Sequence, residues 1–383
     1  MHPAGVASRL PLRESAYGFR MTELKHTPLF ARHEALGAKI ADFGGWAMPI
    51  EYQGVVAEHT AVREQVGIFD VSHMGKLRIT GVGALDAVNA IVTNDINRLV
   101  DGQAQYSLLC NDEGGAIDDL IVYRASETEI RIVPNASNAD VVAPFIAARL
   151  PEGVTLENRH NDLGILAIQG PVVDGVMQAL GLPHSHGYMS FVDAEFAGAE
   201  VMVCRTGYTG ERGFEIMAPN AVLEALWDAA TAAGALPIGL GARDTLRTEM
   251  GYALHGHELS PTITPVQARV GWAVGWSKPA FSGRDALVAE KAAGAKRTLR
   301  GLLALDRGIP RGEMDVYGDE VGGTLVGRTT SGTFSPTLKA GIALAYLDAG
   351  IAEGAELVID VRGRGLLCRV VRPPFVEGTS VAN

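Results

Sequence analysis

The chain has 383 residues, of which 47% are hydrophobic and 20% charged, a composition typical of a globular protein with enough apolar material for two or three domains. Its formal charge is −11 and it contains no basic run, so a nucleic-acid-binding surface is not expected. No apolar run is long enough to span a bilayer, and the three cysteines are far apart with no CxxC spacing, so neither a membrane protein nor a disulfide framework is expected.

The first residues, up to Met21, contain several arginines and a single acid, with no apolar segment of the kind that secretion signals carry. A transit peptide is one interpretation of this stretch. The other is an upstream extension, because Met21 and the following "TELKHTPLF" suit a natural start. We expect residues 1–21 to be an N-terminal extension outside the fold.

Strand and helix patterns alternate through the first part of the chain. "NDEGG" lies between two apolar runs and predicts a hairpin. Period-two alternation predicts strands, and apolar spacing of three and four predicts helices. In chain order we expect a strand at 75–81, a helix at 83–92, hairpin strands at 106–110 and 117–124, a strand at 129–134 and a helix at 138–150.

The second half contains two buried strands and the clearest helix before its pattern changes. "LGILAIQGP" (163–171) and the stretch 199–219 read as buried strands, the latter interrupted by a glycine-rich loop. Residues 220–234 predict a helix that Asn220 caps and Gly234 ends. After "FSGRDAL" (281–287), short strands between turns predict a separate β domain of about a hundred residues.

Two adjacent carboxylates, Asp118 and Asp119, open the second hairpin strand. Because neighbouring side chains on a strand point to opposite faces, Asp119 shares a face with Ile121 and Tyr123, and Asp118 lies on the other. Either both aspartates bond the amides of the glycine turn, or one is held at a cleft for a cationic or proton-bearing group. Local sequence leaves both interpretations open.

The stretch "TGYTGERGFE" (206–215) does not fit the dinucleotide fingerprint or the Walker loop, so a nucleotide site is not predicted. Glu215 at the start of an apolar strand is either an acid on an edge strand or a functional carboxylate. A carboxylate accepts two parallel hydrogen bonds from an amidine-like donor edge, as found on pterins and guanines.

"GLGARDTLRTEMG" (239–251) places Arg243 beside Asp244 at the start of a helix. Arg243 either pairs with a neighbouring acid or presents its planar guanidinium to a heteroaromatic ring or carboxylate. His255 and His257 would share a face of a strand, but no third ligand is evident, so no metal site is predicted. His73 has no readable triad context.

Taken together, these motifs resemble the T-protein family of the glycine cleavage system, which are folate-dependent aminomethyltransferases. The resemblance covers about residues 22–380 in order. It rests on "TPLF" (27–30), "FGGWAMPIEY" (43–52), "FDVSHMG" (69–75), "NDEGGAIDDLIVYR" (111–124), "AIQGP" (167–171), "TGYTGERGFE", "GLGARDTLRTEMG", "TSGTFSPTL" (330–338) and "PPFV" (373–376).

The resemblance implies an α+β fold in which three domains form a disc around a central folate channel, with a C-terminal β-barrel-like domain. The first, folate-binding domain is discontinuous in this family. We therefore expect it at residues 22–70 and 160–285, an inserted α+β second domain at 71–159, and the C-terminal β domain at 286–383.

The implied reaction starts from an aminomethyl group on the lipoyl arm of the partner H-protein. Ammonia is released and the one-carbon unit passes to tetrahydrofolate, the co-substrate, giving methylenetetrahydrofolate. The second aspartate of the pair is the one tied to catalysis in this family, which corresponds to Asp119. We expect Asp119 to orient the folate nitrogens and stabilise cationic iminium character, and Asp118 to support the turn.

By the same resemblance, Glu215 takes the donor edge of the pterin and Arg243 contacts the bound folate. The channel is expected to be lined by Met74, Tyr106, Asn135 and Tyr208. The chain departs from some members at His255, where they have a tyrosine, so a folate contact is less expected there.

Related proteins of the same fold leave three alternatives: a folate-dependent demethylase, an iron–sulfur assembly scaffold, and a folate-binding module without turnover. The scaffold class carries a characteristic cysteine in a KGC-type motif, whereas this chain has Tyr208 in that loop. We expect a cytoplasmic protein, or a mitochondrial matrix protein if the source is eukaryotic, with neither nucleic acid nor a membrane as a partner.

Overall fold

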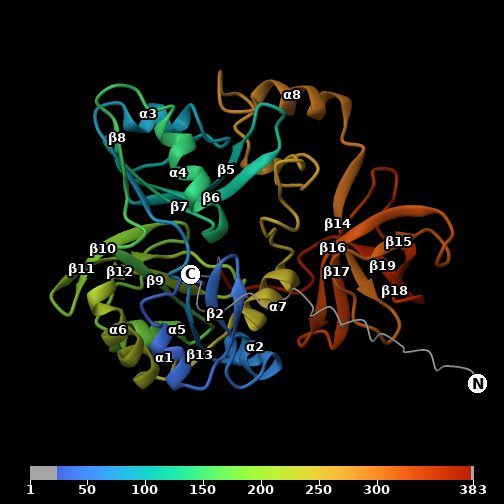
Figure 1. The fold of residues 1–383 in the computed structure, drawn as a ribbon, viewed down its shortest axis with the longest axis horizontal. Coiled ribbons are helices and arrows are strands. Elements are labelled where there is room, and N and C mark those ends of the chain that lie inside the picture. The colour runs from blue at the N-terminus through green and yellow to red at the C-terminus, as the bar shows by residue number, and fades with distance from the viewer. Residues whose placement is uncertain (1–23, 381–383) are drawn as a thin grey trace, which may run out of the picture.

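The computed structural model describes residues 24–380, so the expected extension at 1–21 lies outside the described residues. Figure 1 shows three groups of elements. A mixed group lies at the lower left, a second group of strands with α3 and α4 lies above it, and the C-terminal strands lie at the right. Among residues 24–380, no helix is long and apolar enough to cross a membrane.

The first group is built on a six-stranded sheet, which is antiparallel except where β13 pairs with β3. The two halves of this sheet come from distant parts of the sequence, since β3 precedes the second group of elements and β9 follows it. In order across the sheet, the strands are β10 (Phe191–Phe196), β11 (Ala199–Cys204), β12 (Gly213–Pro219), β9 (Leu163–Gln169), β3 (Gly67–Asp70) and β13 (Leu236–Pro237).

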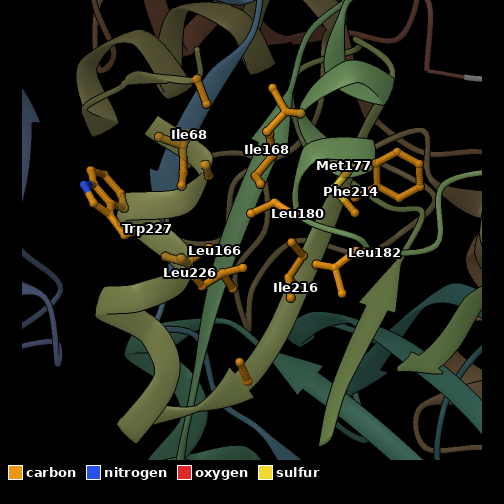
Figure 2. Close-up of a cluster of buried hydrophobic side chains, with 14 of the residues drawn as sticks. Ile68, Leu166, Ile168, Met177, Leu180, Leu182, Phe214, Ile216, Leu226 and Trp227 are labelled. Atoms are coloured by element: carbon orange, nitrogen blue, oxygen red, sulfur yellow. The ribbon is translucent and has the colours of Figure 1, made fainter. Parts of the chain in front are cut away.

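Alternating side chains give this sheet two buried faces. One face, shown in Figure 2, packs Ile168 and Phe214 against helices α5 (Val173–Ala179) and α6 (Asn220–Ala232), with Trp227 of α6 buried in the cluster. Burying these large side chains contributes about 2 kcal/mol each. The opposite face meets the second group of elements and helix α7 (Leu240–Met250), and it is this face that concerns the site.

The second group is a five-stranded antiparallel sheet covered by two helices. The strands lie in the order β5 (Gln103–Cys110), β6 (Ala116–Ser126), β7 (Glu129–Pro134), β4 (Leu77–Thr80) and β8 (Thr155–Asn158). Its outer face packs on α3 (Ala84–Asn89) and α4 (Ala139–Ala147). Val122 and Ile132 on this face have no exposed surface. The hairpin expected around residues 111–115 is formed by β5 and β6.

The C-terminal strands close into a six-stranded barrel, as the run of short strands predicted. Around the barrel the order is β14 (Arg297–Ala304), β17 (Ala340–Asp348), β16 (Leu325–Ser335), β15 (Asp315–Tyr317), β18 (Glu356–Val361) and β19 (Arg364–Val371). Closure leaves no free sheet edge.

The remaining elements join these groups. They are α1 (Phe30–Ala35), the ribbon β1 (Lys39–Phe43) and β2 (Trp46–Glu51), α2 (Val55–Glu64), α8 (Arg284–Ala293) and the short 3-10 turns η2 (Ile96–Arg98), η3 (Ala136–Asn138) and η4 (Gly271–Ala273).

The predicted α+β class with a C-terminal barrel is confirmed. The expected capping role of Asn220 is wrong, because Pro219 is the N-cap of α6 and the Asn220 amide donates to Asn161 O at 2.7 Å. The domain boundaries stay a prediction, although every strand of the five-stranded sheet lies between residues 77 and 158.

Candidate active site

Asp118 and Asp119 lie side by side on β6 and point to opposite faces of the five-stranded sheet. Asp118 is fully buried on the face that packs under α3 and α4, with Leu120 and Val122. Asp119 lies on the other face, with Ile121 and Tyr123, toward the six-stranded sheet. The strand alternation predicted this division. Asp119 also keeps some accessible surface, as a group that meets a substrate must.

Asp118 does not support the hairpin turn, contrary to expectation. Its carboxylate accepts hydrogen bonds from the backbone N–H and Nδ2 of Asn135, both at 2.9 Å, and from Nδ2 of Asn138 at 2.7 Å. The turn is instead held by Asn111, whose Oδ1 accepts from Gly115 N at 2.8 Å. Asp118 therefore fixes the start of η3, which follows β7.

Asp119 is held by two of the residues predicted to lie near it. The Tyr106 hydroxyl donates to Oδ2 at 3.0 Å, and Asn135 Nδ2 donates to Oδ1 at 2.9 Å. The Asn135 amide thus bridges the two aspartates. Burial and the charge of Asp118 raise the pKa of Asp119, and the hydrogen bonds from Tyr106 and Asn135 only partly oppose this shift. Burial likewise raises the pKa of Asp118, against its three N–H donors.

Glu215 lies on β12 and points to the same interlayer space as Asp119. Its neighbours Phe214 and Ile216 face the α5 and α6 side, so Glu215 faces the five-stranded sheet. The interpretation of Glu215 as an edge-strand acid is wrong, because β12 pairs on both sides, with β11 and β9. The Thr206 hydroxyl donates to one oxygen of Glu215 at 2.5 Å.

Arg243 projects from the first turns of α7 and is not neutralised by the helix acid beside it. Asp244 pairs with Arg247 at 2.7 Å, so the expected partner of Arg243 is taken. Nη1 of Arg243 is buried and has no hydrogen-bond partner among the described residues. Burial lowers the pKa of Arg243, and the charge of Glu215 acts against this shift. A buried guanidinium nitrogen without an acceptor indicates a place for a ligand acceptor.

Tyr208 forms the wall between Arg243 and the loop after α7. The Arg243 guanidinium lies over the Tyr208 ring, 4.8 Å from its centroid, in cation–π contact. The Tyr208 hydroxyl donates to Ala253 O. Gly207 makes this turn possible, because a Cβ there would lie 2.0 Å from Oε1 of Gln169.

Met74 packs against the interlayer cluster that includes Phe69 and Tyr123. Its carbonyl accepts from His160 Nδ1 at 3.0 Å. Met74 therefore lies beside the cluster between the two sheets, and its place in the channel wall stays a prediction.

Six of the predicted residues, all except Met74, fall into two sets, and the members of each set interact with one another. Asp119, Tyr106 and Asn135 are bonded to one another, while Arg243 touches Tyr208 and interacts electrostatically with Glu215. The charge of His255 acts on the pKa of Asp119, which brings the segment after α7 to the first set. Carboxylates on two facing sheets and a guanidinium on α7 suit a ligand with both donor and acceptor edges.

Sequence analysis missed Asn138, Thr206 and Trp272. Asn138 secures Asp118, and Thr206 secures Glu215. Trp272, which is 69% exposed, packs against the Tyr106 ring with a centroid distance of 5.3 Å. Two local signals were available: the polar "PNASN" turn contains Asn138, and "TGYTGERGFE" contains both Thr206 and Glu215. Trp272 had no local signal, because its contact with Tyr106 joins segments far apart in the sequence.

Two other features bear on the type of site. Within the described part of the chain, no group of three or more His, Cys, Asp or Glu side chains is placed to hold a metal ion. A cavity of about 390 Å³ opens between β4 and β7 on one side and β11 and β12 on the other, and the described residues lining it include none of the predicted site residues.

Comparison with known proteins gives matches over nearly the whole chain. Residues 29–278 match the family model described as the GCVT N-terminal domain, and residues 297–377 match the glycine cleavage T-protein C-terminal barrel domain. An aminomethyltransferase of Frankia alni is 57% identical over 365 residues, covering 94% of this chain and all of the relative. An aminomethyltransferase of Mycobacterium tuberculosis is 54% identical, covering 92% of this chain and 97% of the relative.

A solved structure gives the same result in three dimensions. The crystal structure of the glycine cleavage system aminomethyltransferase T from Bartonella henselae superposes with a TM-score of 0.88 at 33% sequence identity. The match covers 93% of this chain and 99% of that protein, so all three groups of elements are shared.

Proposed function

The chain belongs to the T-protein family of the glycine cleavage system, and from this membership we propose that lipoylated H-protein is its donor and that Asp119 is its catalytic carboxylate. It is an aminomethyltransferase with tetrahydrofolate as co-substrate. The carbon–nitrogen bond of the aminomethyl group breaks, ammonia leaves, and the one-carbon unit is bound by folate as methylenetetrahydrofolate.

The observation that carries the assignment of roles is the state of Asp119. Its carboxylate is directed into the space between the two sheets, is anchored by Tyr106 and Asn135, and has a raised pKa. A carboxylate held in this way accepts a proton near neutral pH more readily than an exposed aspartate. It also offers a fixed negative charge where positive charge develops as ammonia departs.

The binding roles of the other residues follow from their unused hydrogen-bonding capacity. Glu215 is a carboxylate on the wall opposite Asp119, suited to the two parallel N–H donors of a pterin edge. Arg243 has a buried nitrogen without an acceptor and lies next to Tyr208. We assign the acceptor side of the bound folate to Arg243, and the channel wall to Tyr208, Tyr106, Asn135 and Met74.

We further propose the cytoplasm as the compartment and the domain division at residues 22–70 with 160–285, 71–159 and 286–383. The relatives named above are bacterial proteins, and bacteria have no mitochondrial matrix. The family-model boundary between residues 278 and 297 supports the start of the last domain near residue 286. No observation favours the demethylase or scaffold alternatives.

The test is to measure ammonia release and methylenetetrahydrofolate formation with aminomethyl-loaded H-protein and tetrahydrofolate, comparing the wild type with Asp119→Asn. Loss of a general acid or base costs about 10²–10⁴-fold in turnover. We expect a loss of this size while tetrahydrofolate binding is retained. H-protein without its lipoyl group is the control for the donor, and wild-type turnover with that control would overturn the proposed partner.

A further inference from the structure

Glu258 is a carboxylate with no exposed surface, and the proposed mechanism gives it no role. Both of its oxygens are occupied. Oε2 accepts from Arg247 Nη1 at 2.8 Å and from Leu254 N at 3.0 Å, and Oε1 accepts from the hydroxyls of Thr330 at 2.5 Å and Ser331 at 2.6 Å. A buried charge of this kind is tolerated only because every lone pair has a partner.

These partners come from three different parts of the molecule. Arg247 belongs to α7, one turn after Arg243. Thr330 and Ser331 belong to barrel strand β16, and the barrel residue Tyr346 also donates to the Glu258 carbonyl at 2.6 Å. The hydrogen bonds of Glu258 therefore connect helix α7, the barrel and the segment 252–258.

The segment 252–258 is folded on itself, and Glu258 closes it. The Leu254 carbonyl accepts from the amides of His257 and Glu258, at 3.1 and 3.0 Å, while the Leu254 amide donates to the Glu258 carboxylate. The sequence pattern suggested a strand at His255 and His257. The two residues lie instead in this compact turn. Loss of the carboxylate would open the turn at Leu254.

Two groups of the segment reach the candidate site. The carbonyl of Ala253 accepts the Tyr208 hydroxyl, and Tyr208 in turn lies under Arg243. His255 Nε2 lies 3.4 Å from the Ala116 carbonyl, next to the aspartate pair, and its charge acts on the pKa of Asp119. Whatever fixes this segment therefore sets the positions of the Tyr208 ring and of the His255 imidazole near the aspartate pair.

We propose that Glu258 is a positioning residue for the transferase reaction: by holding the segment 252–258 against α7 and the barrel, it sets the positions of Tyr208 and His255 around the folate. This inference rests on the proposed function for its link to catalysis. The fixing of the segment itself is a property of the protein alone and is testable without substrate.

The chain offers a matched control in Glu249. This residue is also fully buried, lies near the end of α7, and joins α7 to the barrel through Ser335 and Thr337. Its other partners, His59 and Arg63, belong to α2. Glu249 therefore resembles Glu258 in joining α7 to the barrel, but it makes none of the described contacts to the segment 252–258.

The experiment compares Glu258→Gln with Glu249→Gln. Glutamine is isosteric, and the Thr330 and Ser331 hydroxyls can accept from its amide, so Glu258→Gln is expected to fold. We expect the KM for tetrahydrofolate to rise about tenfold in Glu258→Gln, because small displacements of positioning groups weaken substrate binding strongly. We also expect the pH profile of turnover to shift. Glu249→Gln is expected to lower the melting temperature but to keep KM within about twofold.

Two further measurements keep the inference apart from the proposed function. Amide hydrogen exchange at residues 252–259 is expected to become faster in Glu258→Gln and not in Glu249→Gln, whether or not the enzyme turns over. Ser331→Ala, which removes one donor, is expected to raise KM in the same direction by a smaller factor. Equal KM changes in the two glutamine variants, or unchanged exchange in Glu258→Gln, would overturn the inference. Absence of folate-dependent turnover in the wild type would overturn the proposed function alone.

Discussion

At the scale of a single residue, the proposed role of Asp119 has a consequence for the stability of the fold. A folded-state pKa above the unfolded value means that the ionised carboxylate is disfavoured by folding. The corresponding contribution to stability is present at low pH and is lost as the pH rises through the raised pKa. Ionising Asp119 near neutral pH therefore costs free energy of folding, as is common for carboxylates in active sites.

Asp119→Asn is expected to increase the free energy of unfolding at pH 7 by about 1 kcal/mol while turnover collapses. An asparagine fits the site, because its oxygen can accept from Asn135 and its amide can donate to the Tyr106 oxygen. Thermal unfolding at pH 5 and pH 7 measures the effect, which is expected to be larger at pH 7. A variant less stable than the wild type at both pH values would contradict this account.

The same raised pKa predicts the pH dependence of turnover. If the ionised form of Asp119 acts, turnover falls on acidification at a pH above that of an ordinary aspartate, which titrates near 4. The pH profile of kcat with saturating tetrahydrofolate measures this limb. A profile that stays flat down to pH 5 would show that the ionised carboxylate is not required.

Arg243→Lys is expected to raise the KM for tetrahydrofolate about tenfold with a smaller effect on kcat. Lysine keeps the charge but loses the planar guanidinium that lies over Tyr208 and presents its free nitrogen. Arg98→Lys, at an exposed arginine on the five-stranded group, is the control and is expected to be silent. If both variants have wild-type KM values, Arg243 does not contact the folate.

The sequence predicted the faces on which Asp118 and Asp119 lie better than it predicted which residues hold them. The period of two on β6 placed Asp118 and Asp119 on opposite faces without any structural information. The partner of Asp118 was missed because Asn135 lies at the end of β7, and only the pairing of β6 with β7 brings the two together. Arg243 was likewise freed by a local competition, since Arg247 captures Asp244.

At the scale of elements, the spacing of apolar residues predicted most strands and helices. The ends of these elements depend on which hydrogen-bond partners the side chains find. The helix expected at 220–234 is present as α6, but Asn161 draws the Asn220 side chain away from the cap. The strand expected at "HGH" is absent from the described fold because the carboxylate of Glu258 and the carbonyl of Leu254 close a turn there. Such competing partners come from distant segments, so local pattern does not reveal them.

Two glycine-to-alanine variants test how tightly the chain packs at Gly115 and at Gly175. Each variant adds a single methyl group. A Cβ at Gly115 would lie 1.9 Å from the Pro261 carbonyl oxygen, so the β5–β6 turn must move. We expect Gly115→Ala to destabilise the protein by about 2 kcal/mol or more and to reduce turnover, because Asp118 follows three residues later.

Gly175 lies inside helix α5 and a Cβ there meets nothing within 4 Å. Gly175→Ala is therefore expected to stabilise the protein by about 0.5–1 kcal/mol through helix propensity. Calorimetry measures the change in unfolding free energy of both variants. A stability change of the same sign in the two variants would refute the assigned packing at one of these glycines.

At the scale of the whole molecule, the barrel is attached to the first group through buried charges as well as apolar contacts. Burial by itself would raise the pKa of Glu249, but the hydrogen bond and charge of His59, the Ser335 hydroxyl and the charge of Arg63 outweigh it and lower the pKa to about 2. Because the folded-state pKa is depressed, the stabilisation is present above pH 4.5 and is lost as the pH falls toward 2.

Glu249→Gln is expected to lower the free energy of unfolding at pH 7 by about 3 kcal/mol and to lose this deficit progressively below pH 4. Melting temperatures of the variant and the wild type between pH 3 and pH 7 measure the convergence. A constant difference across this range would mean that the ionisation of Glu249 does not attach the barrel to α2 and α7.

The strands that precede and follow the five-stranded group in the sequence, β3 and β9, pair with each other. Asp70 of β3 and Leu166 of β9 are Cα partners in neighbouring antiparallel strands, so the chain leaves and re-enters the six-stranded sheet at one point. For that sheet, residues 71–162 are merely a very long loop, and closure entropy grows only by about 0.6 kcal/mol for each doubling of loop length. The pairing of Asp70 with Leu166 therefore does not depend on the length of this segment, although the segment also covers one face of the sheet through Tyr123 and Val133. Asp119 lies within this segment, whereas Glu215 and Arg243 lie outside it, so the proposed catalytic carboxylate and the proposed pterin-binding residues come from separate parts of the chain.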